Sequence, residues 1–354
     1  MHQVKLLLAA ALVGLGVIAS AAAAPPNDPL YASYQWGPQQ IRAEQAWSTS
    51  RGAGQVIAIV DSGIDLAHPD LAGKIAGGAT FTGCASTGPC GNGDWESGGA
   101  GGQPPSPHGT HVAGIAAATT GNGIGIAGVA PDARLLAVKV LTEEGGSFEE
   151  IAAGIRWATD NGADVINMSL GALPGVQALA ITGLIADTRE AVAYAVSRGV
   201  VVIAAAGNDF ASICGEPAFD PNILCVVATD RNETRASYSN FGVSQAPDNV
   251  VAAPGGAGTL FCEDDVVSTV PSSAGGFCTD DLGIPGYDAY AGTSMATPHV
   301  AGVAALLTAQ GRSRADVIRI LKQTARTPVL GVRGVYTPVF GHGIVDATAA
   351  VAAP

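Results

Sequence analysis

Positive charge is scarce in this sequence. Its 354 residues include 17 Lys and Arg against 30 Asp and Glu, which gives a formal net charge of −13, and only 13% of the residues are charged. Nucleic acids and anionic membranes attract proteins through an excess of positive charge. The composition therefore argues against both as partners. No Cys and His spacing indicates a zinc site either.

The chain also lacks an apolar run of the length that crosses a bilayer, which is about 20 residues. The N-terminal run from Leu6 to Ala19 is shorter, follows Lys5, and leads into the small residues 20–24. This three-part layout is typical of a secretory signal, and its length disfavours the alternative of a membrane anchor. We expect a signal peptide over residues 1–23, cut between Ala21 and Ala24, and a secreted protein, extracellular or periplasmic.

Cysteines are few but informative. There are six, and they fall as three close pairs: Cys84 and Cys90, Cys214 and Cys225, Cys262 and Cys278. An even number in an exported protein indicates disulfides, although six cysteines allow many pairings. We expect sequential pairing because each pair brackets a polar, Gly-rich or Pro-containing loop. The alternative is buried free thiols.

Short, continuous apolar runs rich in Val and Ile alternate with helical patterns. Such runs are typical of parallel strands that are buried on both faces. The expected strands are Val56 to Val60, Leu135 to Leu141, Val165 to Met168, Val200 to Ala206, Cys225 to Thr229 and Val250 to Ala253. The expected helices lie near His108 to Ala118, Phe148 to Asn161, Asp187 to Arg198, Thr297 to Gln310 and Arg314 to Thr324. This order predicts an α/β protein with a mainly parallel sheet, and we expect residues 24–354 to form a single domain.

Polar residues follow three of these strands directly. They are Asp61 in Val-Asp-Ser-Gly, Ser169 after Met168, and Asn208 in Ala-Ala-Gly-Asn. Open parallel sheets bind ligands beyond the carboxyl ends of their strands. Each residue alone is more often a cap or a turn residue than a catalyst.

Two further segments combine with them. The segment 292–302, Gly-Thr-Ser-Met-Ala-Thr-Pro-His-Val-Ala-Gly, places Ser294 where a helix begins, and Pro298 is tolerated only near such a start. The segment 107–114, Pro-His-Gly-Thr-His-Val-Ala-Gly, places His108 at the start of another helix. A serine nucleophile needs a base and an orienting carboxylate, which His108 and Asp61 would provide.

Together these segments resemble the Asp, His and Ser signatures of the subtilase family, in that family's chain order. The resemblance runs from about Asn27 to residues 341–346, Gly-His-Gly-Ile-Val-Asp, and implies a subtilisin-like three-layer fold with helices on both sides of the sheet. It implies a serine endopeptidase with Ser294 as nucleophile, His108 as general base and then acid, and Asp61 as the orienting carboxylate. Asn208 matches the side chain that stabilises the oxyanion.

The resemblance also implies contacts with an extended peptide. Gly145-Gly146-Ser147 and Ser169-Leu170-Gly171 are similar to the two edge segments that pair with the substrate backbone. Gly215 lies in the stretch similar to the primary pocket. At P1, the residue whose carbonyl is attacked, we expect large apolar side chains, with basic ones tolerated through Glu216 and Asp209.

One structural calcium ion is implied by similarity to a strong family site. Three separated segments would form it: Asp28 in Asn-Asp-Pro, Asp70 in His-Pro-Asp, and the loop from Thr119 to Ile126. Carboxylates, an amide oxygen and carbonyls make a suitable set for a hard cation. The expected ligands are Asp28 and Asp70, the side chain of Asn122, and the carbonyls of Thr119, Ile124 and Ile126.

We therefore predict a secreted, monomeric endopeptidase that acts on proteins or peptides through an acyl-enzyme. A peptide ligase or cyclase would use the same intermediate and differs only in whether an amine or water accepts the acyl group. A catalytically silent binding protein on the same fold is the alternative from another class, since fold alone does not define function.

Overall fold

The computed structural model describes residues 25–83, 103, 107–172, 176, 183, 185–242, 248–328 and 330–354. The expected signal peptide and the expected Cys84–Cys90 disulfide lie outside these residues. None of the described helices is long and apolar enough to pass through a membrane.

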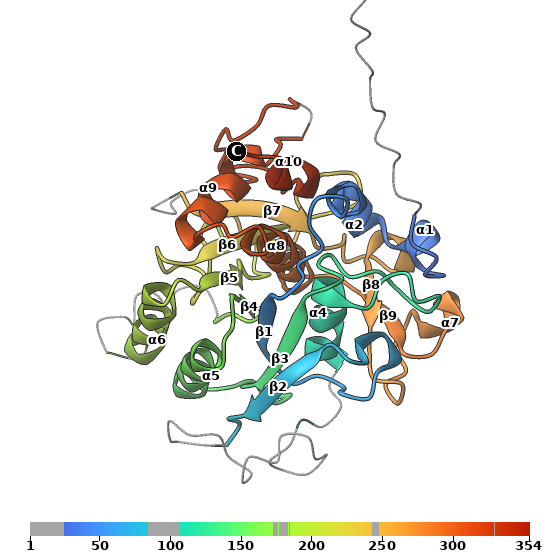
Figure 1. Cartoon of the computed structure of the whole chain (residues 1–354), viewed down its shortest axis with the longest axis horizontal. Coiled ribbons are helices and arrows are strands. Elements are labelled where there is room, and N and C mark those ends of the chain that lie inside the picture. Colours follow the sequence, from blue (N-terminus) through green and yellow to red (C-terminus); the bar gives the residue numbers. More distant parts are fainter. Residues whose placement is uncertain are drawn as a thin grey trace, which may run out of the picture.

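A parallel sheet forms the centre of the molecule, as predicted, and in the described part of the chain it has seven strands (Figure 1). All neighbouring strands pair in parallel. Their spatial order is β2 (Ile75–Thr80), β3 (Arg134–Lys139), β1 (Val56–Asp61), β4 (Val165–Met168), β5 (Val201–Ala205), β6 (Leu224–Thr229) and β7 (Val250–Pro254). Strands β4 to β7 are buried at every residue because helices cover both faces, which explains their continuous apolar runs.

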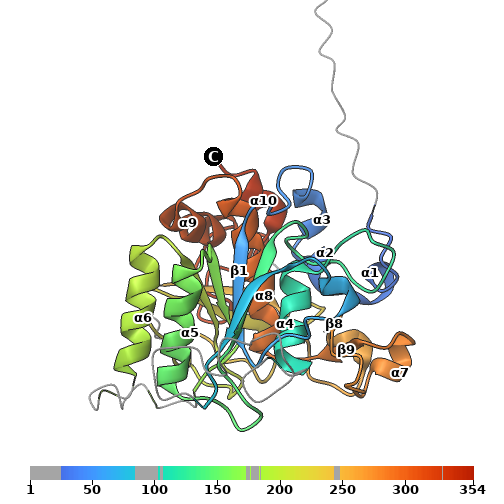
Figure 2. The same cartoon turned by 60° about the horizontal axis from the view of Figure 1, so that its bottom comes forward.

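The helices form the two outer layers. Helices α5 (Phe148–Asp160) and α6 (Ala186–Ser197) pack against each other beside the sheet, and α4 (Pro107–Ala117) packs against α8 (Thr293–Thr308) on the other side (Figure 2). Helix α9 (Arg314–Thr324) and the short α10 (Ala347–Val351) follow α8. This three-layer arrangement confirms the predicted fold class.

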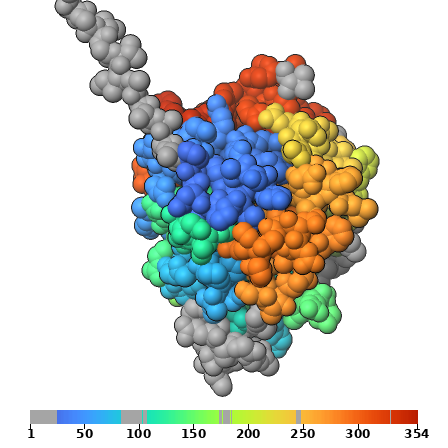
Figure 3. Space-filling view, turned by 90° about the vertical axis from the view of Figure 1, so that its right-hand side faces the viewer, coloured from blue at the N-terminus to red at the C-terminus, as the bar shows by residue number. Residues whose placement is uncertain are grey.

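Smaller elements lie beside the main sheet. The N-terminal arm contains three short helices, and a second, antiparallel sheet pairs β8 with β9. Their bounds are α1 (Tyr31–Tyr34), α2 (Trp36–Gln40), α3 (Ala43–Ala46), the 3₁₀ turns η1 (Pro69–Leu71) and η4 (Cys262–Asp264), β8 (Val266–Thr269), α7 (Thr279–Leu282) and β9 (Tyr287–Tyr290). In Figure 3 the dark-blue N-terminal arm lies next to the teal loop that follows α4 and to the orange segment that carries β8, α7 and β9.

Several described elements were not predicted from the sequence, among them one strand of the main sheet. Strand β2 was not predicted because Gly77 and Gly78 interrupt its apolar pattern, and it pairs at the edge of the sheet with β3 alone. Helix α8 begins at Thr293, four residues before the coarser expected bound at Thr297, and it agrees with the placement of Ser294 at a helix start. Its first turn therefore includes Ser294.

Candidate active site

Asp61 and His108 form the centre of the site. Asp61 ends β1 and is fully buried, and its Oδ1 lies 2.7 Å from Nδ1 of His108 in the first turn of α4. Burial acts to lower the pKa of His108, but the attraction of Asp61 and the hydrogen bond to it outweigh burial and raise that pKa. The carboxylate thus fixes both the orientation and the basicity of the imidazole.

The pair is assembled by direct backbone contact between β1 and α4. The N–H of Gly109 donates to Oγ of Ser62 at 3.1 Å, and the N–H of Ser62 donates to Oδ1 of Asp61 at 2.7 Å. A Cβ added to Gly109 would lie 2.1 Å from the carbonyl oxygen of Gly63. Only glycine permits this approach, so the Gly after the histidine is required for the Asp–His distance.

Ser294 lies at the start of α8, next to strand β4. Its Oγ donates to the carbonyl oxygen of Ser169 at 3.2 Å, and Oγ of Ser169 donates to the carbonyl oxygen of Ser294 at 2.7 Å. Pro298 has no N–H, so the helical bond to the Ser294 carbonyl cannot form and that carbonyl is free to accept from Ser169. The proline thus couples the serine to the end of β4.

Asn208 follows β5 and faces the same helix start. Its Oδ1 accepts from the N–H of Thr293 at 2.9 Å and from the Thr293 hydroxyl at 3.0 Å. With the amide oxygen held in this way, Nδ2 points to the other side. A Cβ built on Gly292 would lie 3.6 Å from both Asn208 Nδ2 and Ser294 N. Two nitrogen donors therefore lie at contact distance from one point beside Gly292, an arrangement suited to stabilising an oxyanion.

Thr293 was not singled out in the sequence, although it immediately precedes Ser294. Its hydroxyl also accepts from the N–H of Gly207 at 3.1 Å, so it joins the end of β5 to the start of α8. Its position next to Ser294 could have indicated a role. A threonine beside the nucleophile is expected to be buried, as Thr293 is, and a buried hydroxyl needs hydrogen-bond partners.

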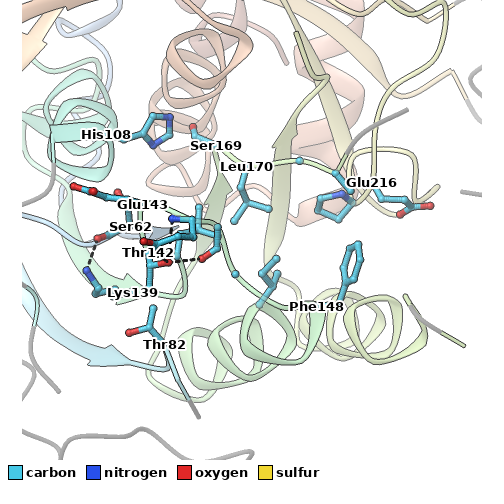
Figure 4. A pocket seen from close by; sticks show the side chains of 18 of the residues that line it. Ser62, Thr82, His108, Lys139, Thr142, Glu143, Phe148, Ser169, Leu170 and Glu216 are labelled. Atoms are coloured by element: carbon cyan, nitrogen blue, oxygen red, sulfur yellow. Dashed lines mark hydrogen bonds between the residues drawn. The ribbon is translucent and has the colours of Figure 1, made fainter. Parts of the chain in front are cut away.

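A cavity of about 910 Å³ extends from His108 and holds most of the predicted substrate contacts (Figure 4). The predicted residues that line it are Gly145, Gly146, Ser169, Leu170 and Gly171. Ser147 and Gly215 do not line it. Ser147 caps α5 in a capping box with Glu150, and the N–H of Gly215 donates to the carbonyl of Ala206.

Glu216, which was expected to help accept basic P1 residues, has a partner of its own. Glu216 lines the cavity, but Arg189 on α6 pairs with its carboxylate at 2.6 Å. Burial raises the pKa of Glu216, and Arg189 acts in the opposite direction. Asp209 is not among the residues that line the cavity. The carboxylate of Glu216 is therefore already paired, and the acceptance of basic P1 residues stays a prediction.

The predicted calcium residues converge. Asp28 accepts from the N–H of Gly121 at 2.8 Å and from the N–H of Asn122 at 3.2 Å, and Oδ1 of Asp70 accepts from Nδ2 of Asn122 at 2.7 Å. Asp70 also accepts from the hydroxyl of Tyr287 at 2.8 Å, a contact that the sequence did not indicate. The N-terminal arm, the loop after α4 and β9 thus meet at two carboxylates.

The donor set at this place fits a hard cation. Asp28 and Asp70 are buried, which raises the pKa of both, and neither pairs with a described Lys or Arg. The carbonyl oxygens of Thr119, Ile124 and Ile126 accept no hydrogen bond from any other described residue. The described residues hold no group of three or more His, Cys, Asp or Glu side chains suited to a metal. The candidate ligands are instead mainly amide and carbonyl oxygens, which calcium accepts.

Two of the three expected disulfides are present. Cys214 pairs with Cys225 and Cys262 with Cys278, which confirms the sequential pairing at these positions. The first closes the loop between β5 and β6. The second joins η4 to the residue before α7, beside β8 and β9.

The resemblance is borne out by comparison with known proteins. The subtilase family pattern matches residues 52–343. Thermitase from Thermoactinomyces vulgaris is 44% identical, over 85% of this chain and 91% of that protein. Subtilisin Savinase from Lederbergia lenta is 40% identical, over 90% of this chain and 98% of that protein. An extracellular protease of Xanthomonas campestris pv. campestris is 38% identical over 93% of this chain, which spans 57% of that protein's length.

Solved structures agree. A protease from Pseudoalteromonas arctica superposes with a TM-score of 0.73 at 34% identity, over 93% of this chain and 99% of that one. A lanthipeptide protease also gives a TM-score of 0.73, at 26% identity. The fold and these relatives define a subtilisin-like serine peptidase. The chain belongs to the subtilase family.

Proposed function

We propose that this protein is a secreted serine endopeptidase that hydrolyses peptide bonds through an acyl-enzyme on Ser294. The observation that carries the proposal is the 2.7 Å contact between Asp61 and His108 at one end of a cavity whose wall includes Ser169, the residue that exchanges hydrogen bonds with Ser294. Family membership supports a protease function in general. The individual residue roles are our inference from the geometry.

In the acylation step, His108 takes the proton of the Ser294 hydroxyl while Oγ attacks the substrate carbonyl. Oγ donates to Ser169 O in the free protein, so it must turn toward Nε2 of His108 when substrate binds. Asp61 holds the Nδ1 proton and stabilises the imidazolium that forms. His108 then protonates the leaving amine.

The tetrahedral oxyanion is stabilised by Nδ2 of Asn208 and the N–H of Ser294, which lie together beside Gly292. Thr293 holds the Asn208 amide in this orientation before the reaction, so no energy is spent turning it during the step. Water then attacks the acyl-enzyme with His108 as the general base.

The substrate is a protein or peptide in an extended conformation. We infer that it pairs with Gly145-Gly146 on one side and Ser169-Leu170-Gly171 on the other, because these segments line the cavity. Main-chain bonds would then provide most of the affinity, which is consistent with broad specificity. We further propose that the protein acts as a monomer, without nucleic acid or membrane partners, and that residues 24–354 form one domain after removal of 1–23.

Labelling with a fluorophosphonate tests this function. We expect stoichiometric modification of Ser294 in the parent protein and none in Ser294→Ala, whose hydrolysis falls by several orders of magnitude. Products with new carboxyl termini support hydrolysis, whereas joined or cyclic products would show a ligase. An unlabelled Ser294 and uncleaved substrates would show a binding protein instead.

We also propose that Asp28, Asp70, Asn122 and the carbonyls of Thr119, Ile124 and Ile126 hold one structural calcium ion. The ion would neutralise the two buried carboxylates and tie the N-terminal arm to the core, without a part in catalysis. To serve as a ligand, the Asn122 amide must turn so that its oxygen replaces its nitrogen beside Asp70.

Thermal melts of the Ser294→Ala variant, in EDTA and in millimolar calcium, test this site. Calcium at about 100 times its Kd stabilises by about 2.7 kcal/mol, so we expect the Tm of a domain of this size to rise by about 4 °C. Asp70→Asn should abolish the rise. Asp164→Asn, which changes another half-buried carboxylate that accepts a backbone N–H, should keep it. Equal melting points for the unmodified site would disprove calcium binding.

A further inference from the structure

A lysine is buried beside the Asp–His pair, and none of the described carboxylates pairs with it. Lys139 ends β3 and is paired in register with Asp61 on β1, and it is only 8% exposed. Burial lowers its pKa. Its Nζ donates to the carbonyl oxygen of Ser62 at 3.0 Å, the dashed line below His108 in Figure 4. No carboxylate among the described residues forms an ion pair with it. Burying a cation that no described carboxylate pairs with is costly, so the arrangement needs an explanation.

Ser62 is held on both sides and joins the two parts of the Asp–His pair. Its N–H donates to Oδ1 of Asp61 at 2.7 Å, and its Oγ accepts the N–H of Gly109, the residue after His108, at 3.1 Å. Its carbonyl is the acceptor for Lys139. One residue thus connects the end of β1, the first turn of α4 and the end of β3.

We propose that Lys139 and Ser62 are positioning residues that hold Asp61 and His108 at hydrogen-bond distance. This inference rests on the proposed function. Neither residue takes part in proton or acyl transfer. The ammonium of Lys139 holds the turn after β1 through the Ser62 carbonyl. The Ser62 hydroxyl holds the first turn of α4 next to that turn through the N–H of Gly109.

The proposal has a kinetic signature that a purely structural role lacks. Contact with Asp61 raises the pKa of His108, so a loosened pair lowers it. The acid limb of the pH profile of kcat/KM reports this pKa. The other described ionisable groups around the site are Lys139, His111 on α4, and Glu143, Glu144 and Glu216 in the cavity wall. Profiles should be recorded at high salt to screen the exposed Glu143 and Glu144.

The experiment compares Lys139→Met with Lys74→Met on a neutral peptide substrate. Lys74 is a matched control because it is also 8% exposed, and its Nζ also donates to a backbone carbonyl, that of Pro131. It precedes β2, whereas Lys139 ends the neighbouring strand β3. We expect Lys139→Met to lower kcat about tenfold with little change in KM and to move the acid limb about half a pH unit or more to lower pH. Lys74→Met should change only the Tm.

A second arm removes the other contact. Ser62→Ala should shift the acid limb of the kcat/KM profile to lower pH as Lys139→Met does, whereas Ser62→Thr should keep the kcat and the pH profile of the parent. The fold-loss of kcat in the double variant Ser62→Ala with Lys139→Met should be smaller than the product of the two single fold-losses. This arm stands even if Lys139→Met does not fold. The inference is overturned if Lys139→Met and Ser62→Ala both keep the kcat of the parent and the acid limb of its kcat/KM profile. Fluorophosphonate labelling of the parent separates this outcome from failure of the proposed function, in which the parent itself is inactive.

Discussion

Replacing Gly109 by alanine tests whether backbone contact sets the Asp–His distance. A Cβ at this position would lie 2.1 Å from the carbonyl oxygen of Gly63, whereas Cβ atoms in proteins essentially never come closer than 3.0 Å to such an atom. Helix α4 must therefore move by about 1 Å, because the opposing atom is backbone. The 2.7 Å contact between His108 and Asp61 would then lengthen beyond hydrogen-bond range.

The expected loss follows from this displacement. A misplacement of about 1 Å in a catalytic constellation costs about 10²-fold, so we expect kcat/KM to fall by about that factor. Alanine favours helix by about 1 kcal/mol over glycine, so the loss cannot come from helix propensity. Steady-state kinetics on a chromogenic peptide, with Tm from circular dichroism, measure both effects.

Two glycines serve as controls. Gly275 has open space at its Cβ position, so Gly275→Ala should change neither activity nor Tm. In the same helix as Gly109, a Cβ on Gly114 would meet the side-chain hydroxyls of Thr269 and Ser268 at 2.3 and 2.5 Å, so Gly114→Ala should lower the Tm more than the activity. Activity of Gly109→Ala within about threefold of the parent would refute the reasoning, since the pair would then tolerate the shift.

Three further outcomes are expected. Asn208→Ala should lower kcat by about 10²–10³ with KM nearly unchanged, on the scale known for removal of one such donor in subtilisin, and a loss confined to KM would assign Asn208 to substrate binding. Burial lowers the pKa of His299 to about 4, so the neutral ring contributes stability that is complete above about pH 6.5 and is lost as the pH falls towards 4. In urea unfolding of proteins that carry Ser294→Ala, the free energy of unfolding should fall by about 3 kcal/mol less in His299→Gln than in its parent over that pH range. Parallel curves of this free energy against pH would contradict the expectation. Arg189→Ala should free Glu216 and increase cleavage after Lys relative to Leu several-fold at pH 9, and an unchanged cleavage profile would show that Glu216 does not face P1.

The sequence by itself determined the α/β class, the six apolar strands and the segments that carry Asp61, His108, Asn208 and Ser294. These features are local. An apolar run that ends at a polar residue indicates a buried strand and its end, and the glycine after His108 indicates a close backbone contact. Strand β2 has no such local signature because its glycines break the apolar pattern, and it becomes a strand only by pairing with β3. The segment 292–302 placed the start of α8 at Ser294, one residue after its first residue, Thr293.

Only the tertiary structure decided which polar groups meet. Arg189 on α6 neutralises Glu216 across 27 residues of sequence, so a free acidic group in the primary pocket could not be inferred or excluded from the chain alone. The same holds for three hydrogen bonds whose two partners are 77 to 217 residues apart in the sequence. They join Thr293 to Asn208, Lys139 to Ser62, and Tyr287 to Asp70. Sequence patterns report the burial of a residue, whereas hydrogen-bond partners depend on which strands and helices become neighbours in the folded chain.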